Sequence, residues 1–334
     1  MSMKKYLALD SGGTKVLAVL YNEDFEPIRV ARVGSFRDNT TPPELVRRNM
    51  DTLLARLELD KGSILDGITG LIDHTFYEQL REKCVIRSTN HCGEMEAGLH
   101  AAEIFGDGLL ALSGTGATMF GRYAGKNCYA GAYGAAVSDI GSGYWMGREI
   151  LNAAISDYEG WGEETLLTEL VCRHFGFGKE SPEETRKQLN GAIFSIYSRH
   201  DYSPCACVAS CAPLATEAAD QNDPVALRIL QETGQVLGTM MTSMIRKHEI
   251  PSALPMTVSG SVWRGHRRLF DTFSACIREQ APERALLVPE FEPILGVMIR
   301  HWLQLHGKFD RADKARLAEL YPEFRFSLRQ KQLP

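Results

Sequence analysis

Two short apolar runs near the start of the chain are separated by a polar, glycine-rich stretch. Residues 6–9 and 16–21 are apolar, and the residues between them, 10–15, read DSGGTK. Two strands joined by a glycine turn form a β-hairpin. The pattern therefore differs from Rossmann and P-loop nucleotide sites, in which a helix follows the glycine cluster.

The same plan recurs about a hundred residues later. Residues 109–112 are apolar, 113–116 read SGTG, and an apolar run resumes over 117–123. The two copies predict a duplicated domain in which each copy supplies one phosphate-binding turn.

Helical periodicity and further short strands fill the rest of the chain. Residues 43–57 predict a helix that begins at a proline, and 93–104 predict an alanine-rich helix. Short strands are predicted at 29–33, 68–72, 85–88 and 256–258, and helices at 76–83 and 293–305. From about residue 142 to 247 the chain is nearly all helical, and its strongest helix has Asp223 as N-cap and Pro224 at the first position. This order predicts an α/β fold with helices on both faces of mixed sheets.

Composition narrows the class of protein. The 334 residues exceed what one compact core usually takes, so two domains are expected. The net charge is −5 without a basic cluster, which argues against nucleic acid as the main partner. No apolar run approaches the roughly 20 residues of a membrane span, and the first residues become polar too soon for a signal peptide. We therefore expect a cytoplasmic protein with no membrane partner, whose eight cysteines are thiols.

The glycine turns are the first candidates for chemistry. Backbone N–H groups at Gly12 and Gly13 can approach phosphate oxygens closely, while Thr14 adds a hydroxyl group and Lys15 a positive charge. Asp10, at the strand end, could hold Mg²⁺ through water. The alternative is an ordinary hairpin turn with a polar strand end.

The second turn contains Gly114, Thr115 and Gly116. Its interpretation as a phosphate-binding turn is weak alone and becomes stronger because the first turn lies at the same place in its own strand pair. Two opposed hairpins could grip the β- and γ-phosphates from both sides, which is the positioning that phosphoryl transfer needs.

Two further glycine segments carry candidate ligand contacts. Asp139 lies among glycines and aromatic residues in the run 131–147, which suits recognition of sugar hydroxyl groups; alternatively, Ser138 or Asp139 caps the helix that begins near Ser142. Gly260 and Ser261 follow a strand and could pack under a nucleotide base, although a structural turn explains these residues better when they are taken alone.

Taken together in this order, the four motifs resemble the N-acetylglucosamine kinase branch of the BadF/BadG/BcrA/BcrD ATPase family, in the actin, hexokinase and Hsp70 superfamily. The resemblance covers roughly residues 5–300. It implies two RNase H-like (actin-like ATPase) domains with a nucleotide cleft between them. The expected domains are 1–112 and 113–309, with a C-terminal helix near 310–334 that packs back on the first domain. It also implies ATP and Mg²⁺ as cofactors, a small amino sugar phosphorylated at its 6-hydroxyl group, and a homodimer.

The resemblance also implies residue roles. Thr14 and Thr115 would contact phosphate. Asn39, Tyr133, Gly134 and Asp139 would face the sugar, with Tyr133 where the family has tryptophan. The family's general base is an aspartate, and the matching position here is Glu94, a carboxylate that reaches one methylene further.

Other interpretations remain open from the sequence. Glu94 could merely occupy a first helical turn, where acidic residues are favoured, and His91 and Glu96 are alternative bases. The chain could also be an ATPase activator of a 2-hydroxyacyl-CoA dehydratase or benzoyl-CoA reductase, or a degenerate kinase acting as a sensor. The thiols of Cys205, Cys207 and Cys211 lack a fourth ligand nearby and are expected to be core residues on one helix.

Overall fold

The computed structural model describes residues 3–38, 41–135, 137–179, 181–198 and 203–329. Its contacts divide the chain into two compact units. One consists of residues up to 106 together with 287–327, and the other of 107–286 together with the residues from 328 onward. The expected division at residue 112 and the expected placement of 287–309 in the second domain differ from these boundaries.

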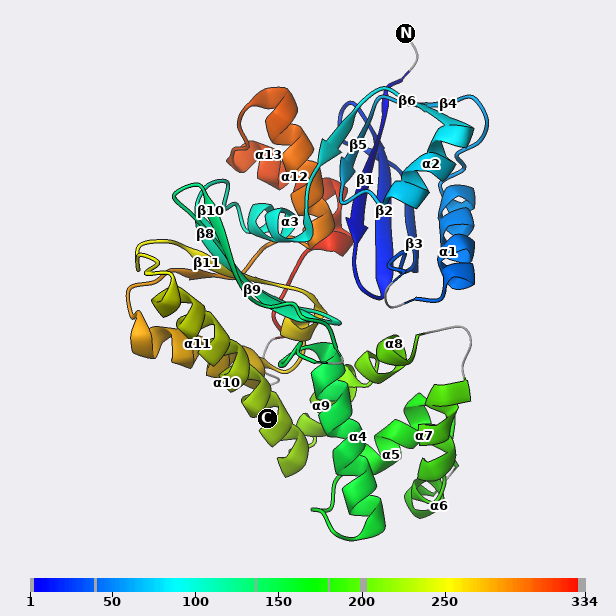
Figure 1. Ribbon diagram of the computed structural model, residues 1–334, viewed down its shortest axis with the longest axis vertical. Coiled ribbons are helices and arrows are strands. Elements are labelled where there is room, and N and C mark those ends of the chain that lie inside the picture. Colours follow the sequence, from blue (N-terminus) through cyan, green and yellow to red (C-terminus); the bar gives the residue numbers. More distant parts are fainter. Residues whose placement is uncertain (1–2, 39–40, 136, 180, 199–202, 330–334) are drawn as a thin grey trace. The chain divides into compact units, whose positions relative to one another are not determined.

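The first unit is built on a five-stranded sheet in the order β3-β2-β1-β5-β7 (Figure 1). Its strands are β1 (Lys5–Ser11), β2 (Lys15–Asn22), β3 (Pro27–Gly34), β5 (Gly67–Gly70) and β7 (Thr89–His91). The first three strands pair antiparallel, whereas β5 is parallel to both β1 and β7. The predicted hairpin around residues 10–15 is thus confirmed. A separate parallel pair, β4 (Ser63–Leu65) and β6 (Cys84–Ile86), contains the first half of the strand expected at 85–88.

Helices cover both faces of this sheet because apolar side chains alternate along its strands. Leu7, Leu9 and Val16 point into the core under α1 (Pro43–Arg56) and α2 (His74–Lys83), whereas Ala8 and Val19 point into the core under α12 (Pro293–His306). Asp73 caps α2 by accepting a hydrogen bond from the Phe76 N–H group at 3.0 Å.

The C-terminal segment belongs to the first unit because α12 packs closely on α3 (Glu94–Ala101). A Cβ atom at Gly296 would lie 1.9 Å from the carbonyl oxygen of Ala97, so only glycine permits this approach. An ion pair of 3.5 Å between Arg300 and Glu96 joins the same two helices. The segment continues through α13 (Arg311–Leu320), whose N-terminus has a capping box from Asp310.

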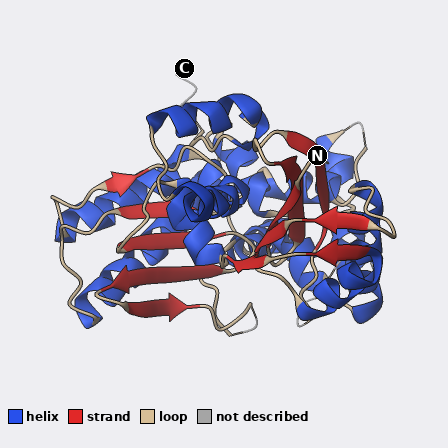
Figure 2. Cartoon of the chain, turned by 90° about the horizontal axis from the view of Figure 1, so that it is seen from above, coloured by secondary structure: helices blue, strands red, loops and turns tan. Residues whose placement is uncertain are grey.

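The second unit repeats the plan of the first sheet. Its strands β8 (Gly108–Ser113), β9 (Ala117–Tyr123), β10 (Lys126–Gly131), β11 (Met256–Ser259) and β12 (Leu286–Leu287) follow the order β10-β9-β8-β11-β12. Here too an antiparallel hairpin is extended by a third antiparallel strand, and a later strand pairs parallel with the first. The strands run side by side on the left of Figure 2. The duplicated strand–turn–strand plan is therefore present in both sheets.

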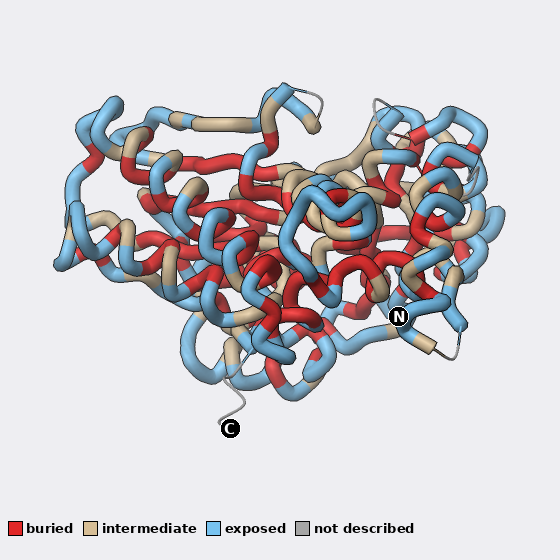
Figure 3. Tube along the Cα trace, turned by 90° about the horizontal axis from the view of Figure 1, so that it is seen from below, coloured by how far each residue is buried: buried red, intermediate tan, exposed pale blue. Residues whose placement is uncertain are grey.

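Helices make up most of the remainder of the second unit. They are α4 (Gly143–Glu159), α5 (Leu167–His174), α6 (Pro182–Arg186), α7 (Leu189–Ser198), α8 (Pro204–Ala209), α9 (Ala212–Ala219), α10 (Pro224–Lys247) and α11 (Arg267–Gln280). The predicted N-cap of α10 is confirmed, since Asp223 accepts a hydrogen bond from the Ala226 N–H group at 2.8 Å. β8, β9 and β11 are largely buried whereas β10 is not, and the helices alternate between buried and exposed positions (Figure 3). No helix in the described ranges is long and apolar enough to cross a bilayer.

The three clustered cysteines lie on two helices, which corrects the single helix expected. α8 ends at Ala209, and Cys211 precedes α9, because Pro213 in the first turn of α9 has no N–H group to continue the earlier helix. Cys207 and Cys211 are buried, and the Cys211 thiol lies 3.8 Å from the carbonyl oxygen of Cys207.

Candidate functional site

The first glycine turn joins β1 to β2 and is partly open to solvent. The Gly12 N–H group donates to the carbonyl oxygen of Lys15 at 2.9 Å and closes the turn. The Ser35 hydroxyl group donates to the carbonyl oxygen of Gly12 at 2.9 Å and supports the turn from the loop that follows β3. Gly13 and Thr14, which are partly exposed, form its tip. The predicted phosphate contacts thus occupy a turn that is held from one side and accessible at its tip.

Asp10 lies at the end of β1 in an unusual electrostatic environment. Removal of its carboxyl group from water, and to a smaller extent the nearby Glu94, raise its pKa from 3.8 to about 7. The positive charges of Lys15 and Arg37 lower the pKa of Asp10, whereas the negative charge of Glu292 raises it, as Glu94 does. A carboxyl group that titrates near neutral pH beside a second carboxylate is typical of a functional site.

Glu94 is the first residue of α3 and follows strand β7 by a short turn. Its carboxylate oxygen Oε2 forms an ion pair of 3.0 Å with the Arg37 guanidinium group, and the two side chains are 28% and 41% exposed. Glu96, the alternative base, instead forms ion pairs with Arg300 and His100. The structure therefore brings Glu94 close to Asp10, while Glu96 serves the packing of α3 on α12.

Two members of this charged group were not predicted from the sequence. Arg37 lies in the loop after β3, and Glu292 is the N-cap residue of α12, where its N–H group donates to the Phe324 carbonyl oxygen at 2.8 Å. Arg37 lies in the segment 34–39 that ends with the expected sugar-binding Asn39, but no role was predicted for it. The proline after Glu292 marks a helix start but says nothing about what lies beside it.

The second glycine turn joins β8 to β9 and is enclosed by backbone. The Gly114 N–H group donates to Gly116 at 2.9 Å, and the N–H groups of Gly143 and Tyr144 donate to the carbonyl oxygens of Gly114 and Thr115 at 2.7 and 3.3 Å. The first N–H groups of α4 are therefore used to fix the turn, so this helix start supports the turn directly.

Ser142, and not Ser138 or Asp139, caps α4. Its hydroxyl group accepts a hydrogen bond from the Trp145 N–H group at 3.1 Å. The correction has a structural reason: Asp139 adopts the left-handed conformation at φ +55°, and a tight turn separates it from the helix, with the Ser142 N–H group donating to its carbonyl oxygen at 3.0 Å. The side chain of Asp139 is consequently not needed for capping.

Asp139 is buried against the second glycine turn. A Cβ atom at Gly116 would lie 2.8 Å from its Oδ2 atom, so the carboxyl group occupies the space that glycine leaves. A left-handed conformation at a residue other than glycine is uncommon and is enriched at functional sites. Gly134 and Tyr133 precede Asp139 in the same loop, and Tyr133 is 78% exposed.

Gly260 lies against the second turn from the end of β11. It adopts φ +104°, and a Cβ atom there would lie 2.2 Å from the Ser113 carbonyl oxygen. Ser261 then begins a 3-10 helix, Ser261–Arg264. The Trp263 indole N–H group donates to the Ala111 carbonyl oxygen at 3.0 Å and fixes this helix on β8.

The predicted site residues thus fall into two groups, each within one unit. The first unit holds Asp10, Gly12, Gly13, Thr14, Lys15 and Glu94, and the second holds Gly114, Thr115, Gly116, Tyr133, Gly134, Asp139, Gly260 and Ser261. Asn39 lies outside the described residues.

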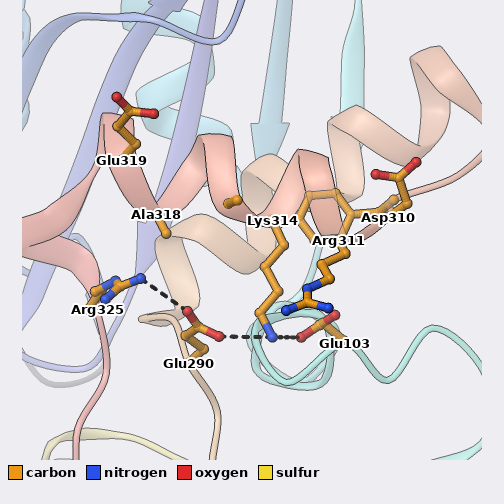
Figure 4. A pocket seen from close by; sticks show the side chains of 10 residues that line it. Glu103, Glu290, Asp310, Arg311, Lys314, Ala318, Glu319 and Arg325 are labelled. Carbon is orange, nitrogen blue, oxygen red and sulfur yellow. Dashed lines mark hydrogen bonds and ion pairs between the residues drawn. The ribbon is translucent and has the colours of Figure 1, made fainter.

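A cavity of about 800 Å³ in the first unit contains none of these residues (Figure 4). It lies along α13, and four of its charged side chains form ion pairs with one another: Lys314 pairs with Glu103 and Glu290, and Glu290 also pairs with Arg325. The hydrogen bonds to Glu103 and Glu290 raise the pKa of Lys314. These contacts connect α13 to the end of α3 and to the residues before α12, which indicates a structural role.

The chain is similar to a family of ATPases and to curated amino-sugar kinases over most of its length. The model of the BadF/BadG/BcrA/BcrD ATPase family matches residues 7–298. An N-acetylmuramic acid/N-acetylglucosamine kinase of Clostridium acetobutylicum is 24% identical over 311 residues, covering 89% of this chain and 98% of that protein. An N-acetyl-D-glucosamine kinase of Dictyostelium discoideum is 23% identical, covering 90% of this chain and 98% of that protein.

A solved structure from Chromobacterium violaceum, provisionally assigned as an N-acetylglucosamine kinase, superimposes with a TM-score of 0.61 at 19% identity. The match covers 90% of this chain and 99% of that one. At this level of identity the likeness shows the fold, and it confirms the predicted fold class.

Proposed function

Because this chain belongs to the BadF/BadG/BcrA/BcrD ATPase family, we propose that it is an ATP-dependent kinase that phosphorylates N-acetylglucosamine or a related amino sugar at the 6-hydroxyl group. The observation that carries the proposal is the placement of Asp10 and Glu94 beside an accessible glycine turn, in one unit. The full-length similarity to two curated amino-sugar kinases supports the substrate class.

In the proposed reaction, the first turn binds phosphate oxygens. Backbone N–H groups at the tip of the turn and the Thr14 hydroxyl group donate hydrogen bonds, and the Lys15 ammonium group offsets negative charge. In the second unit, the SGTG turn offers Thr115 and its backbone for the same ligand class, and Asp139 can accept hydrogen bonds from sugar hydroxyl groups.

Glu94 is the proposed general base. Its carboxylate accepts the proton of the sugar hydroxyl group while the hydroxyl oxygen forms a bond to the γ-phosphorus, and the bond from that phosphorus to the ADP oxygen breaks. Proton acceptance by a positioned carboxylate contributes about 10²- to 10⁴-fold to the rate.

The donor set at the first turn fits a hard divalent cation. Mg²⁺ prefers oxygen ligands and keeps several waters, and the Asp10 carboxylate can hold such a hydrated ion once it has lost its proton. When bound with ATP, the cation supplies neutralisation of phosphate charge. Since the pKa of Asp10 is about 7, protons compete with the cation for this carboxylate near neutral pH.

The homodimer and the cytoplasmic location expected from the sequence belong to this proposal as well. Light scattering on the purified protein measures the oligomeric state directly, and a monomer at micromolar concentration would contradict the expected dimer.

The test is ADP release with Mg·ATP against N-acetylglucosamine, glucosamine, glucose, N-acetylmannosamine and a blank without sugar. We expect stimulation by an amino sugar, and we expect Glu94→Gln to lower kcat by at least about 10²-fold. Glu94→Asp should retain more activity than Glu94→Gln, because it keeps a carboxylate. If no sugar stimulates ADP release while calorimetry shows ATP binding, the kinase proposal is wrong, and an activator or a sensor becomes the better explanation.

A further inference from the structure

The loop between β3 and α1 reaches both the first glycine turn and the proposed base. Ser35 is buried, and its hydroxyl group donates to the Gly12 carbonyl oxygen at 2.9 Å while accepting the Arg37 N–H group at 3.1 Å. The Arg37 side chain then forms its ion pair with Glu94. One short segment therefore connects the phosphate turn to the carboxylate of Glu94.

The backbone of residues 35–37 is held by contacts on both sides of Phe36. Phe36 is buried and its ring lies 5.0 Å from that of Phe76, centroid to centroid. The Asn49 amide group donates to the Ser35 carbonyl oxygen at 3.0 Å, and the Thr41 N–H group donates to the Arg37 carbonyl oxygen at 3.0 Å. A side chain that starts from a fixed backbone loses less freedom when it forms an ion pair, so Arg37 is preorganised to meet Glu94.

Several carboxylates lie near the ion pair between Arg37 and Glu94. Asp10 and Glu292 both lie within electrostatic reach of the site, so the region carries several carboxylates. Arg37 also lies 3.5 Å from the Ser11 carbonyl oxygen, next to Asp10 in the chain. Its guanidinium group can thus hold Glu94 in one orientation against the repulsion of the other carboxylates.

We propose that Arg37 is a positioning residue that holds the Glu94 carboxylate in the orientation needed to accept the substrate proton. The inference rests on the proposed function, in which Glu94 is the base. Stability alone gives a poor account of the pair, because a partly exposed ion pair contributes little to folding. Sequence reasoning could not find this role, since Arg37 has no motif and its partner lies on a distant helix.

The experiment measures steady-state kinetics of Arg37→Gln, Arg37→Lys, Glu94→Gln and the double variant Arg37→Gln/Glu94→Gln, with radiolabelled ATP to resolve slow turnover. We expect Arg37→Gln to lower kcat by about 10- to 100-fold, with the KM values for ATP and sugar nearly unchanged, because a small misplacement of a catalytic group costs about that much. Arg37→Lys should recover part of the loss. The double variant should come close to Glu94→Gln, because Arg37 forms its ion pair with Glu94, whereas its lowering of the Asp10 pKa is the smallest of the effects on that group.

Arg29→Gln is the matched control. Arg29 forms an ion pair of 2.6 Å with Glu58 in the same unit, and its side chain is 45% exposed, close to the exposure of Arg37. This variant should keep wild-type kinetics, and both arginine variants should keep the wild-type melting temperature within a few degrees.

Three results would overturn the inference while leaving the kinase intact. One is a kcat for Arg37→Gln within twofold of wild type. Another is a raised KM for the sugar at unchanged kcat, which would mean that Arg37 binds substrate directly. The third is a further tenfold loss when Arg37→Gln is added to Glu94→Gln. A wild-type protein that phosphorylates no sugar on the panel would instead refute the proposed function and the inference together.

Discussion

The two glycine turns share one plan but are stabilised in different ways. The first, at residues 10–15, is surrounded by charged side chains, and Asp10 there has a pKa raised to about 7 by burial and by Glu94. The second, at 113–116, is fixed by backbone hydrogen bonds from the start of α4 and by the close approach of Gly260. The duplicated hairpin thus became a charged site in one unit and a tightly packed backbone site in the other.

This difference separates a turn surrounded by charged side chains from a turn that is fixed by backbone contacts. Changes of charge at the first turn should affect activity strongly and can leave folding intact or even improve it. Changes of volume at the second turn should affect folding first, because backbone atoms cannot move aside as a flexible side chain can.

Replacement of Asp10 by Asn should have the largest effect. We expect kcat to fall by about 10²- to 10³-fold, because a preorganised charge at the phosphate site is lost. At pH 8 the variant should nevertheless be more stable than wild type, by at most about 4 kcal/mol, since the raised pKa means that ionised Asp10 destabilises the folded state. Guanidinium unfolding at several pH values, together with the kinase assay, measures both effects.

The sign of this effect follows from linkage. The folded state holds the Asp10 proton more tightly than the unfolded chain, so stability declines as the pH rises from about 4 through 7. The advantage of Asp10→Asn should therefore shrink as the pH is lowered toward 4. Asp24→Asn, at an exposed turn, is the control and should show no such trend. If Asp10→Asn exceeded the stability of wild type by the same amount at pH 5 and at pH 8, ionised Asp10 would not be what destabilises the folded state.

Gly260→Ala tests the backbone character of the second turn. Its Cβ atom would meet the Ser113 carbonyl oxygen at 2.2 Å, and the residue would keep a positive φ, so we expect a loss of about 3 kcal/mol or more in the free energy of unfolding. Gly125→Ala is the matched control, because Gly125 also has a positive φ but would place its Cβ atom in open space. It should lose only about 1 kcal/mol. Equal losses in chemical denaturation would show that the close approach costs nothing.

Much of this arrangement could be predicted from the sequence because it depends on local signals. Apolar runs beside DSGGTK and SGTG define both hairpins, and Asp223 followed by Pro224 defines the start of α10. Asp10 was found because it lies at the end of a predicted strand, whereas Glu94 was found because it matches the position of the family's aspartate base.

The rest depends on contacts between distant parts of the chain. The C-terminal segment joins the first unit because Gly296 lets α12 approach Ala97, and a glycine inside a helix does not reveal its partner. The roles of Arg37 and Glu292 likewise could not be predicted, because they depend on where Asp10 and Glu94 lie in the folded protein. The N-cap of α4 was expected at Ser138 or Asp139 but lies at Ser142. The left-handed turn at Asp139, which separates that residue from the helix, cannot be seen in the sequence.

Among these variants, Ser113→Ala should have the smallest effect on stability and on kcat. It tests whether a side-chain hydrogen bond also supports the second turn. The Ser113 hydroxyl group is fully buried and donates to the Gly141 carbonyl oxygen at 2.8 Å, so its removal leaves a buried acceptor without this donor. We expect a loss of about 1 kcal/mol in chemical denaturation, whereas Ser198→Ala, at an exposed helix position, should change stability by less than about 0.5 kcal/mol. Because Ser113 supports the turn and carries no charge, kcat should stay within about twofold of wild type. A large fall in kcat with little loss of stability would mean that the Ser113 hydroxyl group takes a direct part in the reaction, and its assignment as a support of the turn would then be wrong.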